Sequence, residues 1–231
     1  MKMTHIDIPA QFQRNSAKVL ALGLEKTGCL LLDRANALLG WPDLAGKDLL
    51  DVGCGVRFTQ TIINRGLAIG SYTGVEIDAP LVQYLSENVA DSRFAFHHWN
   101  VHNAMYNPGG EKLTPATRPP FARTQRFDAI WLYSVLTHTC PQDTACLLRI
   151  LRRHVKRDGA LLFSAFVDDA VETFEDRLKD QPLMNAFYGE KYLRRLAQDA
   201  GWHVQTRFDG WTDIAMQTLF VCRPRVRLWP W

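Results

Sequence analysis

The sequence predicts an α/β domain built on a doubly wound, mostly parallel sheet of seven strands with an antiparallel strand at its carboxyl end. Three observations predict this class. Strand-like and helix-like segments alternate between residues 48 and 167, a glycine-rich turn follows the first strand, and two strand-like runs close the chain with no helix between them. Alternating strands and helices form parallel sheets that are covered by helices on both faces.

The amino-terminal part is predicted to form two helices that cap the sheet. Residues 11–40 carry apolar side chains at helical spacing, with a break near Thr27-Gly28 and an end at Gly40. We therefore interpret residues 1–231 as a single domain. A helical cap occupies residues 1–43, and the ligand-binding core occupies residues 44–231.

The core follows the alternation element by element. Strands are expected at residues 48–52, 72–78, 94–99, 127–133 and 159–167, followed by a terminal pair at 202–208 and 216–222. Helices are expected at residues 58–64, 79–88, 141–155, 174–179 and 190–200. The proline-rich stretch 107–121 has loop composition and is either a lid over a binding site or a disordered insertion.

Composition and charge argue against several classes of function. The chain has 231 residues, 47% of them hydrophobic, and a net charge of +3, which is too small to predict a nucleic-acid partner. The amino terminus lacks the apolar core of a signal peptide, and no apolar run approaches the roughly 20 residues of a membrane span. Five cysteines without a CxxC pair predict reduced thiols and no structural zinc. We expect a cytoplasmic protein without stable membrane insertion.

The segment Asp51-Val52-Gly53-Cys54-Gly55 predicts a nucleotide-like ligand. Glycines at a strand-to-helix turn let the backbone approach a ligand and point amides at it. A dinucleotide would favour a third glycine at the position of Phe58, so this ring favours S-adenosylmethionine over NAD. Glu76, at the end of the second strand, can accept hydrogen bonds from ribose hydroxyls, which suits either ligand.

Three segments together resemble the successive motifs of class I S-adenosylmethionine-dependent methyltransferases: residues 51–55, 73–76 and 127–133. A narrower similarity, over residues 55–60, 97–108 and 132–138, is to a bacterial branch without an assigned substrate. The resemblance implies the Rossmann-like methyltransferase fold with S-adenosylmethionine as cofactor. The cofactor contacts that it implies come from Asp51, Gly53, Cys54, Gly55, Glu76, Ile77, Asn100, Val101 and Tyr133. Two residues depart from the family pattern, because Arg57 replaces the third glycine and Asn100 replaces an acid.

His138 is the candidate catalytic residue. It follows the fourth strand, where ligands bind in open parallel sheets, and an imidazole can take the proton of a hydroxyl acceptor. The alternative is a packing or capping histidine. His97, His98 and His102 lack metal-ligand spacing, and no acid after the fourth strand accompanies Asp168-Asp169, so no metal site is predicted.

The resulting hypothesis is methyl transfer to a small-molecule or glycan acceptor, most simply at oxygen. Two alternatives remain open at this point: an NAD-dependent oxidoreductase, and a non-catalytic S-adenosylmethionine-binding protein that serves as an interaction partner. A homo-oligomer is compatible with the sequence. The basic and aromatic tail, residues 223–231, is either a solvated end or a contact for an anionic surface.

Overall fold

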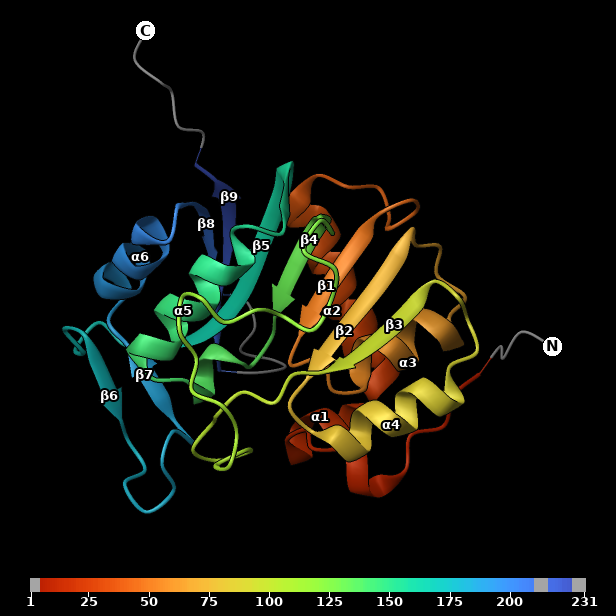
Figure 1. Cartoon of the computed structure of the whole chain (residues 1–231), viewed down its shortest axis with the longest axis horizontal. Helices are drawn as coiled ribbons and strands as arrows, with labels where there is room; N and C mark the ends of the chain where they lie inside the picture. Colours follow the sequence, from red (N-terminus) through yellow and green to blue (C-terminus); the bar gives the residue numbers. More distant parts are fainter. Residues whose placement is uncertain (1–4, 210–215, 226–231) are drawn as a thin grey trace, which may run out of the picture.

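The computed structural model describes residues 5–209 and 216–225 and arranges them around one mixed sheet (Figure 1). Seven strands lie side by side in the order β3 (Phe94–His98), β2 (Ser71–Glu76), β1 (Asp48–Val52), β4 (Phe127–Leu132), β5 (Val155–Val167), β9 (Thr218–Pro224) and β8 (Trp202–Phe208). The first five are mutually parallel, and β9 is antiparallel to both of its neighbours. The predicted fold class is confirmed.

Two further short strands correct the sequence prediction. The expected helix at residues 174–179 is wrong, because β6 (Phe174–Asp176) pairs with β7 (Ala186–Tyr188), which in turn pairs in parallel with the end of β5. Phe174 lies edge-on against the ring of Tyr188, with centroids 5.1 Å apart. The Arg177 guanidinium stands 3.8 Å from the centroid of the Phe187 ring. Cross-strand contacts, which periodicity cannot reveal in so short a segment, therefore decide the local structure.

The cap consists of a short 3-10 turn (Ala10–Phe12), α1 (Ala17–Leu22) and α2 (Leu24–Leu39). Its break falls at Gly23, where φ is +90°, and not at Thr27-Gly28 as the sequence suggests. Gly28 instead marks a close approach of two helices. A Cβ atom at this position would lie 1.9 Å from Oγ1 of Thr61 on α3 (Arg57–Asn64). Here glycine serves helix packing rather than a turn.

The remaining helices are α4 (Ala79–Asn88), α5 (Pro141–Leu151) and α6 (Glu190–Asp199), with a second 3-10 turn at Leu136–His138. The strands bury alternate side chains on the two faces of the sheet. Leu50 and Ile130 belong to the core with α5 and α6, whereas Leu49 and Trp131 belong to the core with α2 and α3. Helices on both faces are what the predicted doubly wound sheet requires.

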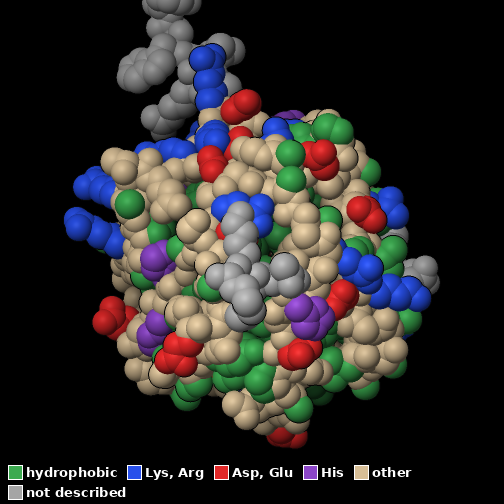
Figure 2. All heavy atoms as spheres, turned by 90° about the vertical axis from the view of Figure 1, so that its right-hand side faces the viewer, with side chains coloured by type: hydrophobic (Ala, Val, Ile, Leu, Met, Phe, Trp, Pro, Cys, Tyr) green, Lys and Arg blue, Asp and Glu red, His purple; other side chains and the backbone are tan. Residues whose placement is uncertain are grey.

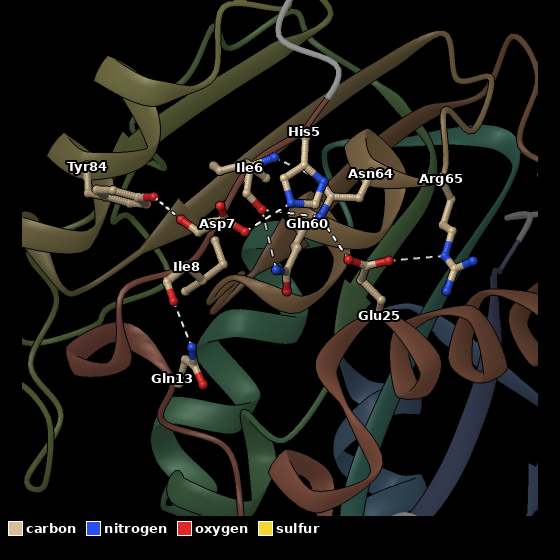
Figure 3. Close-up of polar contacts among 10 residues, drawn as sticks. All are labelled: His5, Ile6, Asp7, Ile8, Gln13, Glu25, Gln60, Asn64, Arg65 and Tyr84. Carbon is tan, nitrogen blue, oxygen red and sulfur yellow. Dashed lines mark hydrogen bonds and ion pairs between the residues drawn. The ribbon is translucent and has the colours of Figure 1, made fainter.

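The amino-terminal segment is fastened across α3 and α4 (Figure 3). The backbone of Ile6 donates to Oδ1 of Asn64 at 2.7 Å and accepts from its Nδ2 at 3.2 Å. The Tyr84 hydroxyl donates to the carbonyl of Asp7. Farther along, Arg14 forms an ion pair with Asp78 at 2.5 Å. These contacts hold residues 6–7 across α3 and α4 and bring Arg14 beside the carboxyl end of β2.

The loop at residues 107–121 is bonded to the segment that follows β3. Glu111 bridges to Val101, and the Asn107 amide donates to the Val101 carbonyl at 2.9 Å. At the far end of the loop, Phe121 packs edge-on against Phe127 and His154. The part of the predicted basic tail from residue 226 onward lies outside the described residues.

The surface and the cysteines add three observations. On the face drawn in Figure 2, acidic and basic side chains are interspersed. Within residues 5–209 and 216–225, no helix is both long and apolar enough to cross a membrane. All five cysteines have free thiols.

Candidate active site

A cavity of about 380 Å³ opens at the carboxyl ends of β1, β2 and β4, a size suited to a small organic ligand. Its walls come from the cap, the glycine turn after β1, the end of β2, the segment after β3, and the stretch from β4 to α5. All but one of the ten predicted site residues line it: Asp51, Gly53, Cys54, Gly55, Glu76, Ile77, Val101, Tyr133 and His138.

The exception is Asn100, which does not line the cavity. Its side chain is exposed, and its Oδ1 accepts a hydrogen bond from Nδ2 of Asn107 at 3.0 Å. The reason is the direction of the backbone, because Trp99 and Val101, on either side of it, are buried and face the cavity. The contact with adenine that the family resemblance implies for Asn100 is therefore not supported by its position.

The glycine turn is shaped by two residues with positive φ, Gly53 at +68° and Gly55 at +47°. The amides of Gly53 and Cys54 donate to the carbonyl of Val75 at 2.8 and 3.2 Å, which ties the turn to β2. A Cβ atom on Gly53 would lie 2.7 Å from Cγ2 of Val135, whereas one on Gly55 would meet nothing within 4 Å. Only glycine adopts such φ values freely, and the open space beside Gly55 allows a ligand to approach the backbone.

The Glu76 carboxylate is oriented by the same turn. Its Oε2 accepts from the amide of Gly55 at 3.1 Å, and its Oε1 accepts from the amide of Ile77 at 2.8 Å. Burial raises the pKa of Glu76 above its ordinary value, and these backbone hydrogen bonds oppose the rise. Each oxygen keeps a lone pair for a further donor, so the carboxylate can receive two hydroxyls of a bound ligand.

Asp51 lies beneath the turn, with 1% of its surface exposed. Its Oδ2 accepts a hydrogen bond from the Tyr72 hydroxyl at 2.6 Å. Burial raises the pKa of Asp51 to about 8, although the Tyr72 hydroxyl and the Arg57 guanidinium lower it. At neutral pH this carboxyl is therefore mostly protonated and carries little charge into the cavity.

Three aromatic side chains pack against one another next to Asp51. Phe58 packs against Trp131 and Tyr133, with ring centroids 5.1 Å from each. Burial raises the pKa of the Tyr133 hydroxyl above its ordinary value, so it stays protonated at physiological pH. Since Phe58 fills the place where a dinucleotide turn needs a glycine, the geometry disfavours NAD.

His138 lies in the 3-10 turn after β4. Its Nδ1 is 3.0 Å from the carbonyl oxygen of Leu183, and its ring meets the Tyr106 ring edge-on at 5.4 Å. A carbonyl only accepts, so we assign the proton to Nδ1, which leaves Nε2 with a free lone pair. Burial lowers the pKa of His138, and the backbone of Leu183 and Met184 opposes this. The imidazole is thus neutral near pH 7 and able to accept a proton.

Asn103 positions the turn that carries His138, and sequence reasoning missed it. Its Nδ2 donates to the His138 carbonyl at 2.8 Å, and its Oδ1 accepts from the amides of Met105 and Tyr106, each at 3.0 Å. An asparagine that bonds to amides two and three residues ahead is a recognisable turn motif. Its contact with residue 138 cannot be inferred from the sequence.

Ser134, Ser164 and Gln217 form a polar cluster on the cavity wall. The Ser134 amide donates to Oγ of Ser164 at 2.8 Å, Ser164 donates to Oε1 of Gln217 at 2.6 Å, and Nε2 of Gln217 donates to Oγ of Ser134 at 2.9 Å. Ser134 has φ of +58°, a strained conformation of the kind that clusters at functional sites. The three come from the turn after β4, from β5 and from the position just before β9, so Ser164 and Gln217 were not predictable as partners.

Among the described residues, no group of three or more His, Cys, Asp or Glu side chains is placed to hold a metal ion.

Comparison with known proteins assigns the chain to a family. Residues 24–207 match the model of a family described as a methyltransferase domain. The chain belongs to this methyltransferase family. The resemblance to class I S-adenosylmethionine-dependent methyltransferases that the sequence indicates is thereby confirmed.

Solved structures of methyltransferases share the fold. Magnesium protoporphyrin IX methyltransferase from Synechocystis PCC 6803, with bound S-adenosylmethionine, is 15% identical with a TM-score of 0.57, over 97% of this chain and 88% of that one. The Burkholderia thailandensis 1,6-didemethyltoxoflavin-N1-methyltransferase, with bound substrate and S-adenosylhomocysteine, is 16% identical with a TM-score of 0.60, over 88% and 79%. A glycopeptide N-methyltransferase complexed with sinefungin is 14% identical with a TM-score of 0.57, over 85% and 94%.

Proposed function

We propose that this methyltransferase moves a methyl group from S-adenosylmethionine to an oxygen atom of a small-molecule or glycan acceptor, with His138 as the general base. The observation that carries the proposal is the orientation of His138. Its Nδ1 is engaged by a backbone carbonyl, and its side chain lines the same cavity as the glycine turn. Its other ring nitrogen is therefore available to a hydroxyl group.

The residues present fit the cofactor. Gly55 leaves room for close contact with its methionine part, and Glu76 holds two carboxylate oxygens ready for the ribose hydroxyls. When bound, S-adenosylmethionine supplies an electrophilic methyl group on a sulfonium sulfur. Ile77 and Val101 provide apolar surface for the adenine, whereas the Asn100 side chain is bonded to Asn107.

His138 supplies the step that a hydroxyl acceptor needs. Its neutral imidazole takes the acceptor proton on Nε2 as the oxygen attacks, and the Leu183 carbonyl stabilises the imidazolium that forms. Asn103 keeps the turn in place during this exchange, through its bond to the His138 carbonyl. The cap and the segment after β3 enclose the cavity, which aligns the reactants and so supplies much of the rate enhancement of a displacement reaction.

A screen of acceptors tests the proposal. Purified protein is incubated with S-adenosylmethionine and matched pairs of hydroxyl and amine compounds, including glycans, and S-adenosylhomocysteine release is measured. We expect turnover with hydroxyl acceptors, methylated at oxygen by NMR. Two of the compared enzymes are named as N-methyltransferases, so turnover with amines alone is the outcome that would refute oxygen transfer.

A further inference from the structure

Arg57 has an unusual position for a charged residue. It is the first residue of α3, directly after the glycine turn, and its partly buried side chain lines the cavity. Burial lowers the pKa of its guanidinium, although Asp51 and Tyr133 oppose this. The class I methyltransferases that the sequence resembles have a glycine at the same position of the motif.

Within the described part of the chain, no side chain pairs with the Arg57 guanidinium. Two arginines line the cavity, and the other, Arg14, is paired with Asp78 at 2.5 Å. Within residues 5–209 and 216–225, the Arg57 side chain makes no hydrogen bond and no ion pair. Asp51 attracts the guanidinium electrostatically, but its carboxyl accepts the Tyr72 hydroxyl at 2.6 Å and forms no ion pair with Arg57. An unpaired, partly desolvated cation is costly unless a ligand supplies the anion.

We propose that Arg57 binds the carboxylate of the methionine part of S-adenosylmethionine. The inference rests on the proposed cofactor and names the residue that recognises its only anionic group. The glycine turn next to Arg57 is the part of the cavity expected to hold the methionine end, which places a planar guanidinium beside a planar carboxylate. Arginine suits this task because its fork of donors can hold both carboxylate oxygens at once.

Calorimetric titration with two ligands tests the assignment. S-adenosylhomocysteine carries the carboxylate, and its decarboxylated analogue, S-adenosyl-3-thiopropylamine, lacks that group alone. The wild-type protein is expected to bind the first about 10- to 100-fold more tightly, the range of one or two charged hydrogen bonds. Arg57→Gln is expected to lose this preference by weakening S-adenosylhomocysteine binding while its affinity for the analogue stays the same.

A control and a second readout separate ligand recognition from folding. Arg65 lies at the other end of α3, where it pairs with Glu25, and Arg65→Gln is expected to keep the full preference. Without ligand, Arg57→Gln is expected to melt no lower than the wild type, because it removes a charge that has no partner. Arg57→Lys should regain only part of the preference, because an ammonium cannot hold both oxygens in one plane.

Three results would overturn the proposal. In the first, Arg57→Gln keeps the wild-type preference; in the second, it loses affinity for both ligands equally; in the third, the wild type binds the two ligands equally. Any of these results assigns Arg57 another role, such as contact with an acceptor carboxylate. Failure of the wild type to bind either ligand is a different result, because it would refute the cofactor itself.

Discussion

Replacing Glu76 by alanine tests the geometry on which cofactor binding depends. In the structure the carboxylate is oriented in advance by two backbone amides, those of Gly55 and Ile77. Little further ordering is needed when the ribose hydroxyls arrive. Loss of hydrogen bonds to a charged group costs about 1 to 3 kcal/mol, so Glu76→Ala should weaken binding of S-adenosylhomocysteine by about 5- to 150-fold.

The assay is calorimetric titration of both proteins between pH 5 and pH 8. The hydroxyls need an ionised acceptor, and burial raises the pKa of Glu76 above 4.5. Wild-type affinity should therefore fall as the pH is lowered, and this loss should be absent in Glu76→Ala. Glu76→Gln is the matched control for shape, because it keeps one acceptor oxygen and should lose less affinity than alanine. Equal affinity of Glu76→Ala and the wild type would refute the assignment of Glu76 to the ribose.

Three further predictions concern the base, the buried acid and the cap. His138→Ala should lower the rate with a hydroxyl acceptor about 10²-fold or more. The acidic limb of the wild-type pH–rate profile should lie below pH 6.5, because burial lowers the pKa of His138. A near-normal rate of His138→Ala would make His138 a structural residue. Asp51 has a pKa of about 8 when folded and 3.8 as its ordinary value, so it stabilises the fold at low pH and this stability is lost as the pH rises toward 8. The melting temperature of Asp51→Asn should therefore rise relative to that of the wild type as the pH is raised from 6 to 9. A difference in melting temperature that stays constant over this range would contradict the burial of an ionisable acid. Gly28→Ala should lower the free energy of unfolding, measured by denaturant titration, by about 1 to 2 kcal/mol, because its Cβ would lie 1.9 Å from Oγ1 of Thr61. This loss is expected despite the better helix propensity of alanine. Adding Thr61→Ala to the same chain should restore part of the loss, and additive effects of the two substitutions would exclude the contact.

The sequence determined the features that depend on neighbouring residues. A glycine turn after a buried strand, an acid at the end of the next strand and the alternation of elements are local patterns. They predicted the parallel sheet, the terminal pair of strands and the place of the glycine turn and Glu76 at the cavity, because parallel strands bring their carboxyl ends to one edge. The resemblance to a family added the cofactor, which the glycine pattern by itself left open between two classes.

Only the tertiary structure decided what depends on contacts between distant segments or on the direction of single side chains. Asn100 looked equivalent to its neighbours in the sequence, yet the backbone turns it outward toward Asn107. Gln217 meets Ser134 from 83 positions away. Gly28 resembled a helix break and is instead a packing contact with α3. The unpaired state of Arg57 likewise became visible only once its surroundings were complete, because the cost of a buried charge depends on every group around it.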